Sequence, residues 1–376
     1  MSVSLHPRVT RLLLLTATLV VGSAVAAAVA TARADARRGV VYTLSNSPSG
    51  NEVLIFDRAG DGTLTPAGAV PTGGLGTGVG LGSQNAVVLG NKGQGLYAVN
   101  AGDNTISAFK VTRRGLEQLG GPVSSGGVAP ISLTVHGNLL YVLNVGDEGA
   151  AGNITGFRAG HGGLTQIAGS TRPLSSSAFV DPPQVQFSPD GRLLLVTEKA
   201  TNLIDVYRVG ADGLTVGPNS QASAAATPFG FAFDKQGDLI VSDAVGAAPG
   251  ASGLSSYDVS ETGVLTAVTP FLGDTQTAAC WVVVTKNGRF TYTTNTGSNT
   301  ISTYSIADDG SLTLLDAVGA STGSAPIDEA LSSDSRYLYA LVSGAIDAFS
   351  VGADGALAPI SGAAGLPTGA TGLAAT

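Results

Sequence analysis

The chain has little of what many enzymes use for chemistry. Among its 376 residues there are one cysteine, one tryptophan and three histidines, and charged residues make up only 12%. Because Cys280 is the only cysteine, no disulfide can form within the chain. Downstream of residue 34, the only histidines are His136 and His161. We therefore expect neither a Ser-His-Asp triad nor a histidine-rich metal site, and we predict no metal and no cofactor.

Positive charge is also scarce. The chain carries 19 Lys and Arg residues against 27 Asp and Glu residues, a formal net charge of −8. An acidic protein repels the phosphate backbone of nucleic acids and the surface of anionic membranes. Nucleic acid is therefore excluded as an expected partner.

The N-terminus has the pattern of an export signal. Two arginines precede a long uncharged run, and an Ala-x-Ala sequence at residues 32–34 is typical of a cleavage site, with residues 28–30 as the alternative. We predict a signal peptide over residues 1–34, and an uncleaved membrane anchor is the alternative because the run is long. In either case we expect residues 35–376 to be secreted, periplasmic or held at the cell surface.

The rest of the chain is one repeated unit. Residues 291–315 read as a strand, a polar loop, an alternating strand, an Asp-Gly turn and the start of another strand. The central strand pattern occurs seven times, at Val40 and then at intervals of about 45–50 residues, a period typical of propeller blades. We predict an all-β fold, a seven-bladed β-propeller of four-stranded blades, forming one domain over residues 35–376.

The first repeat lacks an inner strand, because only the leader precedes Val40. The C-terminal tail, residues 365–376, has the pattern of a spare inner strand. We predict that it pairs beside residues 40–44 and closes the ring, which removes exposed sheet edges. An open array of seven units is the alternative.

The repeat also predicts which side of the ring each loop occupies. Turns from inner to second strand and from third to outer strand lie on one side, which we call the turn face. The remaining loops lie on the other side, the loop face, where propellers usually place their sites at the mouth of the central channel. His136 and His161 fall in turns of the turn face, and we interpret both as turn residues.

Polar residues gather on the predicted loop face. A column stands where the second strands end, and its members are Asn100, Asn144, Glu198, Asp243 and Asn295. Other candidates lie at the starts of inner strands, and these are Gln84, Asp181, Gln184, Trp281 and Asp328. Turn chemistry explains much of the column, because Asn and Asp cap their own loops. Glu is a poor turn former, so Glu198 is the strongest candidate for a general base.

The loop before the second blade departs most from the repeat. In residues 72–84 glycine recurs at nearly every second position. There is no Gly-Lys-Ser/Thr sequence, so a phosphate-binding loop of the nucleotide type is not expected. Such a loop can bring backbone amides close to a ligand, as at Gly78 and Gly80, or it can plug the channel. Low complexity without a function is the alternative.

Residues 181–192, DPPQVQFSPDGR, and the strand that ends at Glu198 resemble the lactonase family of seven-bladed propellers. That family includes relatives of 6-phosphogluconolactonase and of carboxy-muconate lactonizing enzymes, and the resemblance extends over about residues 40–376. The family pattern has Pro-Arg-His before this strand and Asn-Glu after it. Glu198 matches the glutamate, whereas Pro183 and Gln184 stand where the arginine and the histidine would be.

Two hypotheses follow from the resemblance. In the first, the protein is an exported hydrolase of an unphosphorylated sugar lactone or a related ring ester. Glu198 would then be the general base, Gln184 and the amides of the glycine-rich loop would polarise the carbonyl, and the asparagines would hold hydroxyls.

The second hypothesis is a non-catalytic propeller of the cell surface that binds a glycan, a peptide or an envelope partner. It rests on the absent Arg-His pair and on residues 292–301, which are similar to the YVTN repeat of microbial surface propellers. Under either hypothesis we expect a monomer.

Overall fold

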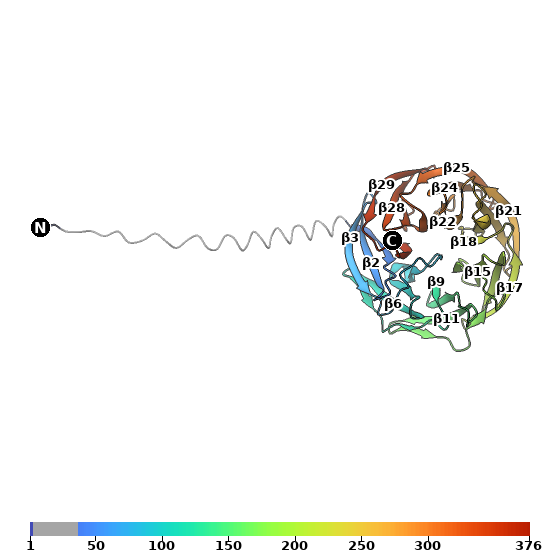
Figure 1. Cartoon of the computed structure of the whole chain (residues 1–376), viewed down its shortest axis with the longest axis horizontal. Coiled ribbons are helices and arrows are strands. Elements are labelled where there is room, and N and C mark those ends of the chain that lie inside the picture. Colours follow the sequence, from blue (N-terminus) through green and yellow to red (C-terminus); the bar gives the residue numbers. More distant parts are fainter. Residues whose placement is uncertain (3–36) are drawn as a thin grey trace.

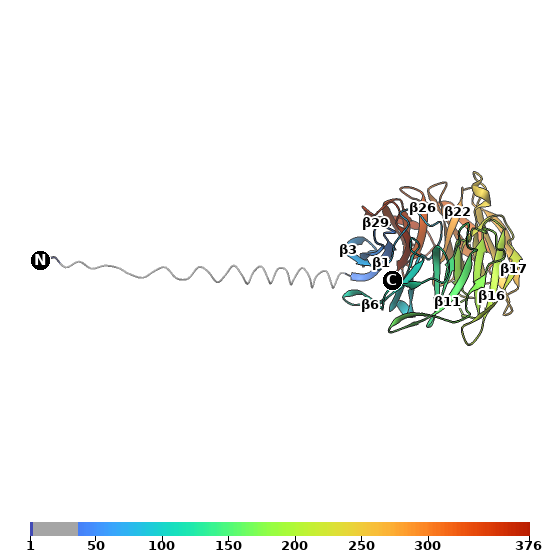
Figure 2. The same cartoon turned by 60° about the horizontal axis from the view of Figure 1, so that its bottom comes forward.

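The seven predicted repeats form seven antiparallel sheets arranged in a ring. The computed structural model describes residues 1–2 and 37–376. Figure 1 shows the ring along its axis, with β9, β18 and β22 near the centre and β17, β21 and β25 at the rim. The tilted view of Figure 2 shows the strands running between the two faces of the ring. The predicted fold, an all-β seven-bladed propeller, is confirmed.

Blades 1 to 4 contain the following strands, given from the centre outwards; in blades 2 and 3 the last two strands both pair with the third. Blade 1 consists of β30 (Thr371–Ala375), β1 (Arg37–Leu44), β2 (Glu52–Ala59) and β3 (Leu64–Pro71). Blade 2 consists of β4 (Val87–Gly90), β5 (Gly95–Asn100), β6 (Thr105–Thr112), β7 (Gly115–Gln118) and β8 (Val123–Ser124). Blade 3 consists of β9 (Pro130–His136), β10 (Leu139–Asn144), β11 (Asn153–Gly160), β12 (Gly163–Gln166) and β13 (Arg172–Pro173). Blade 4 consists of β14 (Gln184–Phe187), β15 (Leu193–Glu198), β16 (Leu203–Val209) and β17 (Thr215–Ala222).

Blades 5 to 7 complete the ring. Blade 5 consists of β18 (Pro228–Phe233), β19 (Leu239–Asp243), β20 (Gly253–Val259) and β21 (Leu265–Gly273). Blade 6 consists of β22 (Ala279–Val284), β23 (Phe290–Asn295), β24 (Thr300–Ile306) and β25 (Leu312–Ser321). Blade 7 consists of β26 (Pro326–Leu331), β27 (Tyr337–Val342), β28 (Ala345–Val351) and β29 (Leu357–Ala364). The described residues also include two short 3₁₀ turns, η1 (Asn91–Gly93) and η2 (Val245–Ala247).

The C-terminal strand closes the ring as predicted. β30 pairs antiparallel with β1, with Val41 opposite Ala375 and Thr43 opposite Leu373. The Thr376 amide also donates to the Val40 carbonyl at 2.9 Å. The first blade is therefore assembled from both ends of the chain, and its pairing leaves no open junction.

The repeat sequence explains how neighbouring blades are joined. The second strands of blades 2 to 7 are buried along their whole length, because each lies between the two neighbouring blades. Tyrosines in these strands donate a hydrogen bond to the carbonyl of the glycine in the next blade's third-to-outer turn: Tyr141 to Gly213 at 2.8 Å, and Tyr292 to Gly355 at 2.9 Å. Tyr339 donates in the same way to Gly62 across the closure, at 2.8 Å. The tyrosine and Asp-Gly signatures are thus two halves of one inter-blade contact.

The predicted leader, residues 1–34 with both candidate cleavage sites, lies outside the described residues. Within residues 37–376, the structure has no helix with the length and apolar character needed to cross a bilayer.

Candidate functional site

The Gln84 side chain reaches from blade 2 to blade 6 on the opposite side of the ring. Gln84, which precedes β4 of blade 2, donates from its amide nitrogen to the Val282 carbonyl of blade 6 at 3.0 Å. Its amide oxygen accepts from the Val282 N–H at 3.3 Å. The backbone N–H of Gln84 donates to the Pro183 carbonyl of blade 4 at 3.1 Å, and the side chain is 4% exposed. Gln84 therefore ties three blades together across the axis.

The glycine-rich loop that leads to Gln84 lies against blade 1. The Gly78 N–H donates to the Asn46 carbonyl at 2.7 Å, and the Asn46 amide donates to the Val79 carbonyl at 2.6 Å. At Gly76 a Cβ atom would collide with the Asn46 backbone, so glycine is required there. Gly80 is exposed and has open space around it. Of the two glycines predicted to bind a ligand, Gly78 thus uses its N–H in a hydrogen bond to Asn46, whereas Gly80 is open to solvent.

Gln184 makes a similar contact at the start of blade 4. Its amide oxygen accepts from the Phe231 N–H at 2.7 Å, and its amide nitrogen donates to the Phe231 carbonyl at 2.8 Å. The same nitrogen donates to Gln186, also at 2.8 Å. Gln184 therefore satisfies the backbone of β18 in the next blade. Its predicted role in catalysis stays a prediction.

The polar column at the ends of the second strands is buried inside the blades. All five residues have 0% exposure. The Asn100 amide donates to Ser107 at 2.9 Å and its oxygen accepts from Thr72, while the Asn295 amide donates to Ser302 at 2.8 Å. Asn144 donates to the Asn153 side chain at 3.0 Å. These side chains fasten the loop-face ends of the blades, and their predicted contact with ligand hydroxyls stays a prediction.

In blade 4 the same position holds a pair of acids. Glu198 accepts from the Ser175 N–H at 3.0 Å and from the hydroxyls of Ser175 and Thr201. Asp205 accepts from the Ser220 hydroxyl. Burial raises the pKa of Asp205 to about 7, and the nearby charge of Glu198 adds to the rise. Asp205 therefore keeps its proton up to about neutral pH.

Two other acidic residues of the predicted site, Asp243 and Asp328, also have buried carboxyl groups. Burial raises the pKa of Asp243 to about 8, and neither of its carboxyl oxygens has a hydrogen-bond partner. Asp328 on β26 is fully buried, accepts from the Glu329 N–H at 2.8 Å through one oxygen and leaves the other unpaired. Burial raises its pKa, and that of Glu329, well above the usual range. Within the described part of the chain, no three acidic, histidine or cysteine side chains converge to hold a metal ion.

A second group of side chains on the loop face is partly open to solvent. The Lys199 ammonium lies 3.0 Å from Asp181 and 4.3 Å from the centre of the Phe229 ring. Phe229 meets Trp281 edge to face, with 4.7 Å between ring centres. The Asp181 side chain is 42% exposed, whereas Trp281 is buried with no partner for its indole N–H. This group, the Lys199 cluster, offers a cation, an acceptor and an aromatic surface side by side.

Sequence reasoning missed two members of these arrangements. Phe229 follows Pro228 at the start of an inner strand, just as Gln184 follows Pro183, so aligning the repeats points to it. Asp205 stands seven residues after Glu198, the spacing of Asn100 to Ser107 and of Asn295 to Ser302. The same alignment therefore predicts a carboxylate pair where other blades have an amide and a hydroxyl.

The remaining reactive side chains lie as expected. Cys280 is buried, and burial raises the pKa of its thiol to about 11, so it is unreactive at neutral pH. His136 ends β9 and His161 occupies the turn between β11 and β12, and both are exposed on the turn face.

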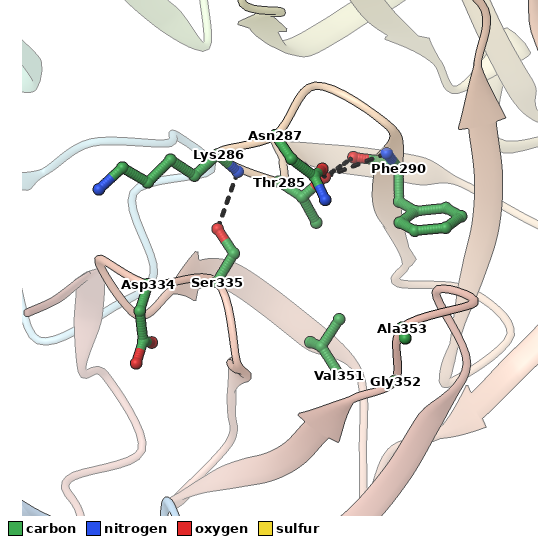
Figure 3. Close-up of a pocket in the computed structure, with 9 residues that line it drawn as sticks. All are labelled: Thr285, Lys286, Asn287, Phe290, Asp334, Ser335, Val351, Gly352 and Ala353. Atoms are coloured by element: carbon green, nitrogen blue, oxygen red, sulfur yellow. Dashed lines mark hydrogen bonds between the residues drawn. The ribbon is translucent and has the colours of Figure 1, made fainter.

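The turn face carries cavities between blades. One of about 590 Å³ separates blades 6 and 7 and is lined by the residues labelled in Figure 3. There the Lys286 N–H donates to the Ser335 hydroxyl at 2.9 Å, and Phe290 and Val351 provide apolar surface. A cavity of about 450 Å³ lies between blades 4 and 5, and one of about 810 Å³ lies between blades 2 and 3.

Comparison with known proteins supports the predicted family. The family model described as "Lactonase, 7-bladed beta-propeller" matches residues 244–367. A comparison with curated proteins finds no significant match. The predicted resemblance to lactonase-family propellers is confirmed by this match, and the blades outside it have the same architecture.

Solved structures with the same fold include a Lactobacillus plantarum protein, with a TM-score of 0.72 and 17% identity over 90% of this chain and 99% of that one. A candidate 6-phosphogluconolactonase of Bacteroides fragilis gives 0.69 and 18% over 90% and 98%. A periplasmic gluconolactonase of Pseudomonas aeruginosa gives 0.63 and 17% over 88% and 98%. At these identities the likeness shows the fold alone.

Proposed function

We propose that this protein is an exported lactonase-like hydrolase of an unphosphorylated sugar lactone or a related ring ester, with its site on the loop face. The observation that carries the proposal is the Lys199 cluster, read together with the lactonase family match. The periplasmic gluconolactonase with the same fold agrees with export and with a lactone as substrate.

The chemistry divides among the cluster as follows. Phe229, supported edge to face by the buried Trp281, offers a surface for the sugar ring, and Asp181 accepts hydrogen bonds from its hydroxyls. The Lys199 ammonium polarises the lactone carbonyl. It thereby supplies the positive charge that the family pattern provides with an arginine at the position where this chain has Pro183. Water adds to the carbonyl carbon, the ring C–O bond breaks, and the released oxygen takes up a proton.

Glu198 is the proposed general base that takes the proton from water. Its carboxylate lies beneath Ser175 and Thr201, so this role requires the segment around Ser175 to move when substrate binds. One lysine is a weak site for a phosphate group, which usually takes several cations. The expected substrate is therefore unphosphorylated.

The test is continuous pH-stat hydrolysis of a lactone panel that includes matched phosphorylated and unphosphorylated sugar lactones. We expect turnover above buffer for the unphosphorylated members, and its loss in Glu198→Gln. A Glu198→Gln protein that unfolds like the wild type but retains full turnover would rule out this mechanism.

A second candidate is a non-catalytic propeller that binds a glycan or another envelope partner at the same cluster. It is favoured by the enclosure of Glu198 and by the engagement of Gln184 with the β18 backbone. Under this function no lactone of the panel is hydrolysed, the protein retains envelope polysaccharide, and Phe229→Ala abolishes the retention.

A further inference from the structure

The cavity between blades 2 and 3 combines free cations with an apolar floor. Its walls include Val111, Leu119 and Ala159, and its polar lining includes Lys110 and Arg113. The volume of about 810 Å³ falls in the range of small-molecule sites, about 300–1,000 Å³. In an acidic protein, such a local excess of positive charge is a distinct feature.

The basic side chains of this cavity form no ion pair with any of the described residues. Lys110, Arg113 and His161 are exposed and form no ion pair. Glu117 stands opposite Lys110 in β7 but does not bridge to it. By contrast, the cavity between blades 4 and 5 is lined by four acids and by Arg192, which pairs with Asp190 at 2.9 Å.

The tyrosine of blade 2 is also uncommitted. Tyr97 occupies the position at which Tyr141 and Tyr292 donate to the next blade. Its hydroxyl accepts from the Asn91 amide at 3.3 Å but donates to no described protein atom, although the residue is only 3% exposed. Tyr97 lacks an acceptor because blade 3 has a two-residue turn at His161 in place of the Asp-Gly turn that accepts from the tyrosine in other blades.

We propose that this cavity binds a small soluble anion, a phosphate or carboxylate joined to an apolar group. Arg113 and Lys110 pair with the anion, His161 lies beside it, and the Tyr97 hydroxyl donates into the site from below. The apolar group rests on Val111 and Leu119. The site is separate from the loop-face cluster and does not depend on lactone hydrolysis.

The test measures binding of phenyl phosphate to the full chain by calorimetry. We expect saturable binding that is at least about tenfold tighter than that of inorganic phosphate, because the ring buries apolar surface, while benzyl alcohol, which lacks the charge, should not bind. Arg113→Gln should weaken phenyl phosphate binding about tenfold, and Tyr97→Phe about fivefold.

Arg114→Gln is the matched control. Arg114 is the other residue of the same two-residue turn, it is exposed, and it does not line the cavity. Arg114→Gln changes the net charge by the same amount as Arg113→Gln but leaves the cavity lining intact. Phenyl phosphate binding should therefore change less than about twofold. Absence of binding, or equal weakening by Arg113→Gln and Arg114→Gln, would overturn the proposal. Capture only by phosphatidylglycerol vesicles would overturn the assignment to a soluble anion.

Discussion

On the loop face the acidic side chains are mostly buried inside the blades, whereas on the turn face between blades 2 and 3 the basic side chains are exposed and, among the described residues, form no ion pair. Glu198 accepts three hydrogen bonds and has no exposed surface, while Arg113 is exposed and lines an open cavity. Both regions are variations of one repeat. The difference shows that changes at a few repeat positions alter either the internal network of a blade or its junction with the next blade.

The largest effect is expected at the Lys199 cluster. Lys199→Met should lower lactone kcat/KM about a hundredfold or more, because it removes the one cation of the cluster that can stabilise a developing oxyanion. Arg192→Met is the control, since Arg192 is a turn-face cation with an acid partner. Initial rates at subsaturating substrate give the comparison. Equal rates for Lys199→Met and the wild type would move the chemistry away from this cluster.

The buried acid pair predicts a dependence of stability on pH. The pKa of Asp205 is raised from 3.8 to about 7, so the folded state holds its proton more tightly than the unfolded state. Stability from this group is therefore fully present near pH 4 and is lost as pH rises to about 7. From pH 5 to 7 the wild type should lose on the order of 2 kcal/mol more than Asp205→Asn in urea unfolding.

A matched check of the acid pair is Asp347→Asn, which removes an acid that is not fully buried in blade 7. This variant keeps the Asp205 carboxyl, so the loss of stability between pH 5 and 7 that Asp205 causes should persist in it. If Asp205→Asn follows the wild-type pH dependence too, folding does not raise the pKa of Asp205.

The junctions between blades predict a smaller, paired effect. Tyr141→Phe leaves the buried Gly213 carbonyl without its donor and should cost about 1–2 kcal/mol of unfolding free energy. Tyr97→Phe removes a hydroxyl that bridges to no other blade and should cost less than about 0.5 kcal/mol. Both costs in unfolding free energy are obtained from the shifts of the urea midpoints, provided that the variants keep the wild-type m-value. Equal costs would show that the inter-blade bond adds nothing.

Much of the fold could be predicted from the sequence because a propeller repeats its local signals. Seven copies of the strand pattern, the Asp-Gly turns and the spare tail were enough to predict the blades and the closure of β30 on β1. The two-residue turns at Arg113 and His161 were not anticipated as a different kind of junction. The turn at His161 keeps the hairpin of blade 3 but presents no acceptor to Tyr97 of blade 2, and this effect arises only between blades.

The candidate site was predicted less completely. Strand phase placed Glu198 and Gln184 at the loop face, but it could not say whether their side chains reach solvent or bond within the blades. The path of Gln84 across the channel depends on distances between blades 2 and 6, which no local pattern encodes. Lys199 and Phe229 come together for the same reason, since they belong to different blades.

Hydrolysis on the loop face is tested most directly by the rate at which an unphosphorylated sugar lactone is hydrolysed by the wild type, by Glu198→Gln and by Glu261→Gln. The two variants make the same chemical change, one at a buried loop-face acid and one at an exposed turn-face acid. We predict turnover that is lost in Glu198→Gln and kept in Glu261→Gln. No turnover by the wild type on any lactone, or turnover unaffected by Glu198→Gln, would contradict the placement of hydrolysis on the loop face.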